Sequence, residues 1–493
     1  MADFNVIAQQ NNTPGTRIEI SNDRAFAFAQ DNPALLIGQV LPGADVTVDE
    51  SITISSTANA RSQFGSGSVL ALMAEQYFKA RTRPINCLPI ADDSSAVAAI
   101  KTITLAGDAG DRSSAAIYIG GKRIQFAVAR NASASDVASE MQIAIAADQN
   151  LPMVATVSAS VLTLTAKNKG LTGEDIDVRL NFYGADNGEG FSGNLTANIE
   201  TATAGAGNPS IADALANIAA QRYEIIVSAF NDVANIDIIR DACDDSITGR
   251  WGPAEMLYGH VIYGKSASYA GCVSYGLTRN DQHASCVGVH GNLEPSWLWA
   301  TAVAAAVNNA IDADPARPFQ TLELKGITAP AILNRFTAGE REQLLSSGIA
   351  TWKVADDGRV LIERVVTTYR ENEAGDADRS YLDANTMFTL SLYARYTKSR
   401  WDQAFPRHKL AKDNTALRPG AKIMTPKIAR QFLIGTYQEL MDLGLVESIE
   451  SFKNELIVEV SDQDPNRLNI VLVPDLINQL RVTAIRVDFV LNN

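Results

Sequence analysis

The run Leu35-Leu36-Ile37-Gly38 has the pattern of a strand buried inside a sheet, because it is continuously apolar and ends at a glycine. A helical pattern opens after Gly65-Ser66-Gly67-Ser68 and places apolar side chains mostly on one face between residues 69 and 77. A second apolar strand follows at residues 84–90. A strand, a helix and a strand in this order are typical of a parallel sheet. The sequence therefore predicts an α/β domain that begins near residue 25.

The pattern changes between residues 99 and 204, where Thr, Ser, Ala, Asn and Gly dominate. Short strands at regular spacing predict a small β-rich domain in this region. We expect strands at residues 100–105, 115–119, 123–129, 154–158 and 161–166, and one helix at residues 135–147. The small residues at 201–207, Thr-Ala-Thr-Ala-Gly-Ala-Gly, have the composition of a linker that leaves this domain.

The α/β pattern then resumes. Helical patterns at 211–221, with Ser210 as a cap candidate, at 235–241 and from Pro295 onward alternate with apolar strands at 223–230, 256–263 and 286–289. Asp356-Asp357-Gly358 separates two alternating runs, at 349–355 and 359–366, and predicts a hairpin. Because the same pattern precedes and follows the β-rich region, we expect one split α/β domain, residues 25–98 and 205–370, with residues 99–204 inserted.

The last region, residues 371–493, predicts an α+β domain. Thr425 and Pro426 have the pattern of a helix start, and Gly444 that of the residue after its end. Strands are expected at 456–460 and 468–473. Near the chain end, apolar and polar residues alternate, which predicts a final strand. This strand either completes the sheet of its own domain or pairs with another chain.

Composition narrows the class of protein. The chain has 493 residues, which suggests about three domains. Its net charge of −14 argues against a nucleic-acid partner. Residues 1–10 lack the pattern of a signal peptide, and no apolar run of about 18 residues is present, so we expect no membrane association. The four cysteines form no CxxC pair, which agrees with a reducing cytoplasm.

Chemical motifs do not indicate an enzyme. No GxSxG occurs, and Gly65-Ser66-Gly67-Ser68 is more typical of a turn in which Ser68 caps a helix. No phosphate-binding loop is present. Four candidate metal ligands lie close together but do not have the spacing of a zinc site; they are Cys272, His283, Cys286 and His290. We therefore expect no catalytic, cofactor-binding or metal-binding residues and no cofactor.

One basic block stands out in this acidic chain. Between residues 395 and 430 the acidic residues are Asp402 and Asp413 only. The basic ones are Arg395, Lys398, Arg400, Arg407, Lys409, Lys412, Arg418, Lys422, Lys427 and Arg430. Such a block is either a solvated face or a docking surface for an acidic partner.

The C-terminal region resembles the tail sheath proteins of Mu-like bacteriophages. Several segments carry the resemblance, in order along the chain: Ser380-Tyr-Leu-Asp-Ala-Asn-Thr-Met387, Pro406-Arg-His-Lys-Leu-Ala411, Thr425-Pro-Lys-Ile-Ala-Arg430, residues 460–469, and Val473-Pro-Asp-Leu-Ile-Asn-Gln-Leu-Arg481. The resemblance implies a subtilisin-like α/β domain without the protease triad. It also implies a variable outer domain, here 99–204, and a tube-proximal C-terminal domain, 371–493.

The same resemblance implies a mechanical function. Such subunits form sixfold stacked rings in a helical sheath around an inner tail tube protein, and contraction drives the tube through the host envelope for genome delivery. Baseplate and tail terminator proteins are further implied partners, and the implied location is the virion tail, assembled in the host bacterial cytoplasm. N- and C-terminal arms, here 1–24 and 482–493, would exchange strands through Arg17, Ile18, Glu19, Ile20, Ile485, Val487, Phe489 and Leu491.

We further hypothesise that part of the basic block faces an acidic tube surface, namely Arg395, Lys398, Arg400, Arg407 and Lys409. Two alternatives belong to other classes of protein. One is a serine hydrolase of the subtilisin type, against which the missing motifs argue. The other is a secreted lattice or adhesion protein, against which the missing signal peptide argues.

Overall fold

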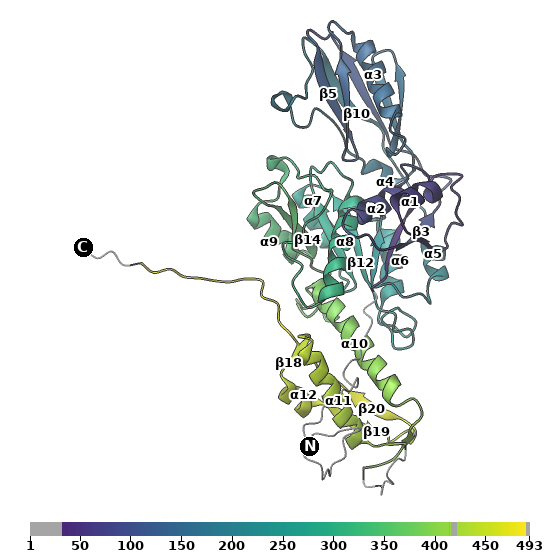
Figure 1. Ribbon diagram of the computed structural model, residues 1–493, viewed down its shortest axis with the longest axis vertical. Coiled ribbons are helices and arrows are strands. Elements are labelled where there is room, and N and C mark those ends of the chain that lie inside the picture. Colours follow the sequence, from purple (N-terminus) through teal and green to yellow (C-terminus); the bar gives the residue numbers. More distant parts are fainter. Residues whose placement is uncertain (1–31, 414, 416–421, 490–493) are drawn as a thin grey trace, which may run out of the picture. The chain divides into compact units, whose positions relative to one another are not determined.

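The computed structural model describes residues 32–413, 415 and 422–489 (Figure 1). Helices and strands are mixed throughout this part of the chain, so the expected combination of α and β elements is confirmed. The N-terminal strand predicted at Arg17, Ile18, Glu19 and Ile20 lies outside the described residues, and so does Leu491.

A mixed eight-stranded sheet contains the largest hydrophobic core, and its strand order is β15-β14-β13-β12-β11-β1-β3-β2. The inner strands from β3 to β14 pair in parallel, and β2 and β15 add antiparallel edges. The strands are β1 Ala34–Gln39, β2 Ile52–Ile54, β3 Ile85–Ile90, β11 Ile225–Ser228, β12 His260–Ser266, β13 Ala284–Val289, β14 Ile349–Val354 and β15 Val360–Arg364. Strands covered on both faces are expected to be continuously apolar, as β1 is from Ala34 to Ile37.

The chain enters this sheet twice. Leu35 of β1 pairs with Asn86 of β3 on one side and with Ile226 of β11 on the other. Residues from both sides of the β-rich region therefore build a single sheet. The predicted hairpin at 349–366 is present as β14 and β15, with Gly358 at a φ of 86°.

Helices cover the sheet on both faces (Figure 1). The longest of them in this region, α8, is buried over most of its length and packs against α2 and β12. The helices are α1 Thr57–Phe64, α2 Val69–Phe78, α5 Ala212–Asn217, α6 Val233–Cys243, α7 Tyr269–Gly276, α8 Ser296–Ala313 and α9 Ala338–Ser346, with a 3₁₀ turn, η2, at Ile332–Asn334. Ser68 caps α2 as predicted, through a hydrogen bond from the backbone nitrogen of Ala71.

Two predicted boundaries were wrong. The strand expected at 256–263 begins only at His260, because Met256 and Tyr258 have positive φ angles of 49° and 57°, which a strand does not accommodate. The helix expected at 211–221 is the shorter α5, and Ile211 rather than Ser210 occupies its N-cap position. Ile211 is completely buried, so core packing determines where the chain turns into this helix.

The β-rich region has its own hydrophobic core, to which Phe126, Met141 and Leu162 contribute. It contains one sheet of order β10-β4-β8-β7 and another of order β6-β5-β9. The elements are β4 Ile100–Ala106, β5 Ser113–Ile119, β6 Lys122–Val128, α3 Ala134–Ala146, β7 Met153–Ser158, β8 Val161–Ala166, α4 Leu171–Glu174, β9 Val178–Leu180, η1 Ala185–Asn187 and β10 Thr196–Thr203.

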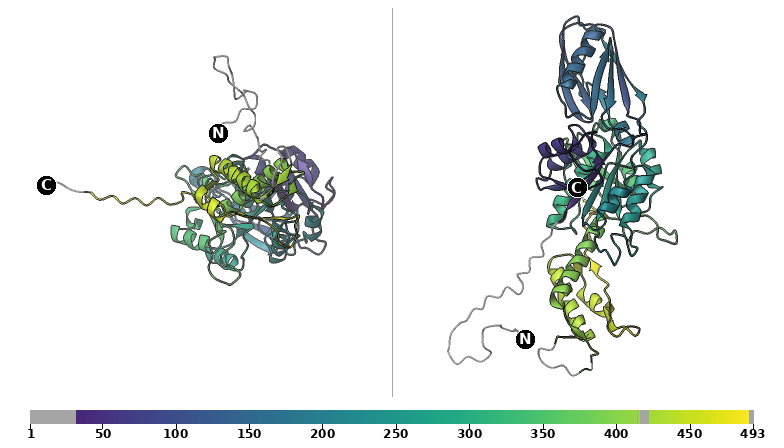
Figure 2. Two further views of the ribbon diagram at one scale, coloured as in Figure 1. Left: turned by 90° about the horizontal axis from the view of Figure 1, so that it is seen from below. Right: turned by 90° about the vertical axis from the view of Figure 1, so that its right-hand side faces the viewer.

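The last region is built on two long helices, α10 Ala384–Ala404 and α11 Pro426–Asp442. The predicted limits of α11 are confirmed, since the Thr425 side chain accepts a hydrogen bond from the backbone nitrogen of Ile428, and Gly444 has a φ of 73°. The remaining elements are β16 Lys409–Leu410, β17 Ile423–Met424, β18 Val446–Glu447, α12 Ile449–Glu455, β19 Ile457–Val460, β20 Leu468–Val471 and β21 Asp475–Leu476. β19 and β20 form an antiparallel hairpin beside α11 (Figure 2).

The segment after β21 pairs with no strand among the residues that the structure describes. Its apolar side chains are open to solvent, with exposed fractions of 81% for Ile485, 80% for Val487 and 78% for Phe489. Among the described residues, the segment up to residue 489 therefore does not complete a sheet of its own domain.

Candidate functional site

The carboxyl ends of β1 and β3 form the edge at which open parallel sheets usually bind ligands, next to the point where the strand order reverses between β1 and β11. Gln39, the last residue of β1, is completely buried there. Its side-chain nitrogen donates to Asp92 Oδ1 at 2.7 Å and to the carbonyl oxygen of Lys169 at 2.8 Å. Thr172 donates its hydroxyl hydrogen to Gln39 Oε1. Residues of the β-rich region thus occupy this edge.

Asn168 completes the same contact. Its Oδ1 accepts from the backbone nitrogen of Val69 at 3.0 Å, and its Nδ2 donates to the carbonyl oxygen of Val40 at 2.9 Å and to Asp92 Oδ1 at 3.0 Å. Burial raises the pKa of Asp92, although hydrogen bonds from the backbone of Lys169 and from Asn168 and Gln39 oppose this rise. The edge is therefore filled by polar groups of the chain that satisfy one another.

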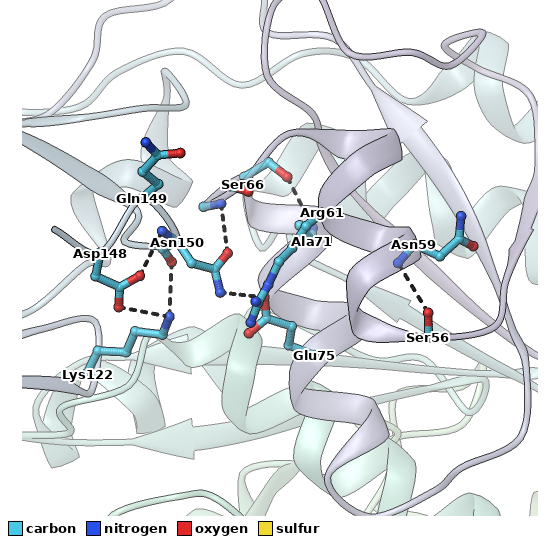
Figure 3. Close-up of polar contacts among 12 residues, drawn as sticks. Ser56, Asn59, Arg61, Ser66, Ala71, Glu75, Lys122, Asp148, Gln149 and Asn150 are labelled. Atoms are coloured by element: carbon cyan, nitrogen blue, oxygen red, sulfur yellow. Dashed lines mark hydrogen bonds and ion pairs between the residues drawn. The ribbon is translucent and has the colours of Figure 1, made fainter. Parts of the chain in front are cut away.

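A second contact joins the β-rich region to α1 and α2 (Figure 3). Asn150 accepts from the backbone nitrogen of Gly67 at 3.2 Å and donates to Glu75 Oε1 at 2.5 Å. Glu75 also pairs with Arg61, whose Nε lies 2.7 Å from Glu75 Oε1. A Cβ atom at residue 67 would lie 2.2 Å from the carbonyl oxygen of Leu151. The Gly-Ser-Gly-Ser stretch is thus a close-approach site as well as a helix start, and Gly67 is the residue in the sequence that indicates this contact.

His260 and Ser285 lie on neighbouring strands, and His260 Nε2 is 2.8 Å from Ser285 Oγ. Both are buried, the ring of Phe388 packs edge-on against the imidazole, and burial lowers the pKa of His260 to about 3. Within the described residues, His260 Nδ1 has no hydrogen-bond partner. A hydrolytic triad needs an accessible serine and a carboxylate on that nitrogen, so this pair does not have the geometry of one.

The candidate metal ligands do not form a site. No group of three or more His, Cys, Asp or Glu residues is arranged for a metal ion in the part of the chain that the structure describes. Cys272 and Cys286 are buried, and burial raises the pKa of Cys272 to about 11, which makes its thiolate unfavourable. No helix within the described ranges is long and apolar enough to cross a membrane.

Part of the basic block is bound within the chain. Arg395 Nη2 lies 3.3 Å from Glu224 Oε2, and the Arg395 side chain is mostly buried. Glu224 is itself buried and also accepts from Ser391 Oγ at 2.6 Å. This contact attaches α10 to the start of β11.

Arg400 binds Glu439 of α11 through two hydrogen bonds, from Nε at 2.9 Å and from Nη2 at 2.6 Å. Lys398, in contrast, is exposed and pairs with Asp402 on its own helix. Arg407 and Lys409 follow α10 and are exposed. The five predicted residues therefore divide into two that bind helices to their neighbours and three that face solvent.

Two features of the last region have no further strand partner among the described residues. Within the described residues, the hairpin of β19 and β20 contains two strands only. It carries half-exposed apolar side chains at Ile457 and Val471. The segment after Arg481 presents Val482, Ile485, Val487 and Phe489 to solvent. Both leave apolar side chains open to solvent.

The profile of the phage tail sheath protein central domain matches residues 204–368, and that of the phage tail sheath C-terminal domain matches residues 376–490. The Mu-like prophage FluMu tail sheath protein of Haemophilus influenzae is 36% identical over 493 residues, which are 99% of each chain.

Solved structures to which this chain is similar include a sheath tail protein of Listeria innocua, with 12% identity, a TM-score of 0.44, and coverage of 91% of this chain and 96% of the other. The helical sheath of the anti-feeding prophage in its contracted state has 10% identity and a TM-score of 0.46, with coverage of 97% and 99%. From the full-length identity and the matched domains, the chain belongs to the phage tail sheath protein family and is a structural subunit of a phage tail.

Proposed function

We propose that this subunit polymerises around an inner tail tube through exchanged terminal strands, and that the resulting sheath shortens when its subunits repack. The observation that carries the proposal is the C-terminal segment, whose alternate side chains are apolar and about four-fifths exposed at Ile485, Val487 and Phe489. Burial of apolar surface contributes about 25 cal/mol per Å², so leaving three such side chains in water is unfavourable. A second copy of the chain is the partner that a sheath subunit meets at every position.

The hairpin of β19 and β20 is the acceptor that we propose. A two-stranded hairpin is only marginally stable alone, and additional strands with an apolar face stabilise it. Ile457 pairs with Val471 in the ladder, and both side chains are about half exposed, at 51% and 49%. Added strands from neighbouring subunits would bury this apolar pair. The N-terminal arm, residues 1–24 with the strand pattern at 17–20, is our candidate for one of these strands.

We also propose the finer division of the chain that the family resemblance implies. In this scheme residues 25–98 and 205–370 form a subtilisin-like α/β domain that has no catalytic step. Residues 99–204 form the outer domain and residues 371–493 the tube-proximal domain. The separate hydrophobic core between Ala99 and Leu195 supports the second boundary. Baseplate and terminator proteins would bind the ends of the polymer, which assembles in the host cytoplasm.

Contraction in this proposal draws its energy from packing. Extended and contracted sheaths would be two arrangements of the same subunits, and the contracted one would bury more surface. Strand exchange through the arms keeps the subunits linked while their folded bodies rotate. The tube would be held before contraction by the solvent-facing cations Lys398, Arg407 and Lys409, which form contacts weak enough to release.

The test is a change to the C-terminal segment alone. Replacing Ile485 and Val487 by aspartate should leave a folded subunit that forms no tubes in negative-stain images. The matched control replaces Ile485 by valine and Val487 by isoleucine, which keeps the alternation, and should form tubes as the parent does. Tubes of normal length and regularity from the aspartate variant, or from a chain ending at Arg481, would contradict the proposal.

A further inference from the structure

Arg481 is the last described residue of the C-terminal segment that is not exposed, whereas exposed and partly buried residues alternate before it. Up to this residue the segment lies along the folded part of the chain, with the backbone nitrogen of Ile477 donating to the carbonyl oxygen of Leu445 at 3.2 Å. The Arg481 side chain is 12% exposed, whereas that of the next residue, Val482, is 83% exposed. Every described residue from 482 to 489 is exposed, so Arg481 is the point after which the segment is continuously exposed.

Arg481 is held by residues at the start of α10. Its Nη2 lies 3.0 Å from Asp383 Oδ1 and donates to Asn385 Oδ1 at 2.9 Å and to Gln479 Oε1. Asn385 is completely buried and donates its own Nδ2 to the carbonyl oxygens of Pro315 and Arg317, each at 2.8 Å. The residues that receive Arg481 are therefore fixed by the loop that follows α8.

Asp383 also binds a second arginine. Arg364, at the end of β15, donates from Nε and Nη2 to the two carboxylate oxygens of Asp383, each at 2.9 Å. Asp383 occupies the N-cap position of α10, but its side chain makes no capping hydrogen bond there. Its carboxylate instead binds Arg364 of β15 and Arg481 of the C-terminal segment. Asp383 therefore links the edge of the central sheet, the start of α10 and the C-terminal segment.

We propose that Arg481 is a positioning residue, which fixes the point from which the C-terminal arm leaves its subunit so that a second copy of the chain receives the arm in one register. This inference rests on the strand exchange proposed above. Register matters because a slip of one residue turns every side chain of a strand to the opposite face. The apolar set at Ile485, Val487 and Phe489 would then face solvent instead of the acceptor.

The distance along the chain explains why this anchor is needed. A strand extends by about 3.3 Å per residue, so Ile485 lies within roughly 13 Å of Arg481. Without the anchor, the closest attachment between backbone groups is the bond at Ile477. Two side-chain bonds would remain between them, from Asn478 Nδ2 to Glu447 Oε1 at 3.2 Å and from Gln320 Nε2 to the carbonyl oxygen of Leu480 at 3.4 Å, and both lie at exposed positions. The arm would gain roughly 13 Å of slack, enough to reach several registers.

The first measurement follows the arm in the unassembled subunit. Spin labels at Lys325→Cys and Val482→Cys report the distance between the folded body and the start of the arm, and the four native cysteines are buried. Arg481→Ala should broaden the distance distribution clearly relative to the parent. Arg486→Ala is the matched control, since it removes an exposed arginine of the same segment that pairs only locally with Asp488. It should leave the distribution narrow.

The second measurement is assembly, scored by the fraction of tubes with regular layer lines. Arg481→Ala should lower this fraction several-fold, and Arg481→Lys, which keeps the charge but not the planar fork, should lower it less. Arg486→Ala should match the parent. If Arg481→Ala fails to fold, Arg481→Lys still tests the inference through the distance distribution.

The possible failures are distinguishable. A narrow distribution and ordered tubes for Arg481→Ala would overturn the positioning role, while a chain ending at Arg481 that forms no tubes would leave strand exchange intact. Normal tubes from the chain ending at Arg481 would instead contradict the proposed strand exchange itself.

Discussion

Asp175 and Ser296 are joined by a hydrogen bond of 2.5 Å from the backbone nitrogen of Ser296 to Asp175 Oδ2. Ser296 is the first residue of α8, and Pro295 before it offers no side-chain cap. A residue of the β-rich region therefore supplies the acceptor that the central helix of the sheet domain lacks. Trp297 strengthens this contact, since its indole nitrogen donates to the carbonyl oxygen of Thr172 at 3.3 Å.

This bond predicts a pH dependence of stability. Burial raises the pKa of Asp175 from 3.8 to about 6, so the folded protein holds this proton more tightly than the unfolded chain. The contribution of Asp175 to stability therefore falls as pH rises from about 4 to about 6, by at most about 3 kcal/mol. Asp175→Asn keeps an acceptor and removes the titration. Its melting temperature relative to the parent should rise across this window, whereas Asp175→Ala should be less stable at every pH. A difference between Asp175→Asn and the parent that does not vary with pH would refute the assignment.

The contact of Asn150 predicts a loss of stability. Asn150→Ala leaves the backbone nitrogen of Gly67 and the carboxylate of Glu75 without this partner. Removing one partner of a buried hydrogen bond costs about 1–3 kcal/mol, which denaturant unfolding would detect. Gln149→Ala is the control, because this neighbouring side chain is exposed and only its backbone oxygen accepts a bond, from Lys167. Equal stability of the two variants would show that the contact contributes little.

The buried pair of His260 and Ser285 predicts sensitivity to acid without hydrolytic chemistry. Burial lowers the pKa of His260 from 6.5 to about 3. As the pH falls, the imidazole is therefore protonated in the unfolded chain before it is protonated in the folded protein. The stability that depends on neutral His260 is complete above about pH 6.5 and is lost as pH falls toward 3. His260→Phe combined with Ser285→Ala should flatten this part of the unfolding curve. A fluorophosphonate probe should not label Ser285, and labelling that disappears in Ser285→Ala would reopen the hydrolase alternative.

The cations that face solvent predict a defect in binding the tube. Lys398→Glu, Arg407→Glu and Lys409→Glu together should reduce co-assembly with purified tube, and more so at low salt, because each charge pair contributes about 1 kcal/mol in water and salt screens it. Tube-free sheath polymers should still form. The comparison variant, Arg400→Glu, should instead lower the melting temperature, since it breaks the bonds to Glu439. Normal sheathing of tubes by the triple variant at both salt concentrations would leave this block as a solvated face.

Local patterns allowed some elements to be predicted closely. Thr425, Pro426 and Gly444 marked both ends of α11, because capping depends on neighbours within a few residues. The run at Leu35–Ile37 predicted β1 for a similar reason. A strand buried on both faces has apolar residues at consecutive positions, so the pattern is local. Family resemblance then supplied the function, which those local patterns did not contain.

Long-range partners could not be predicted in this way. Glu224 lies far from Arg395 in the sequence, and nothing near either residue indicates that they meet. Counting charges between residues 395 and 430 therefore overestimated the free basic surface. The contacts of Asn168 with Asp92 and of Lys169 with Gln39 were missed for the same reason, because polar residues in a Ser- and Asn-rich region have no pattern that distinguishes buried members from exposed ones.

The split of the central sheet has a consequence for synthesis on the ribosome. β1 and β3 leave the ribosome well before β11. While residues 99–204 are made, the edge of β1 that later pairs with β11 has no strand beside it. At about 5–20 residues per second this interval lasts roughly ten seconds. The β-rich region can fold during that time, because its strands pair with one another and it has its own core. Asn168 and Lys169 can then bind Asp92 and Gln39 before the second half of the sheet is made, and residues 99–204 would in that case cover the exposed edge of the incomplete sheet.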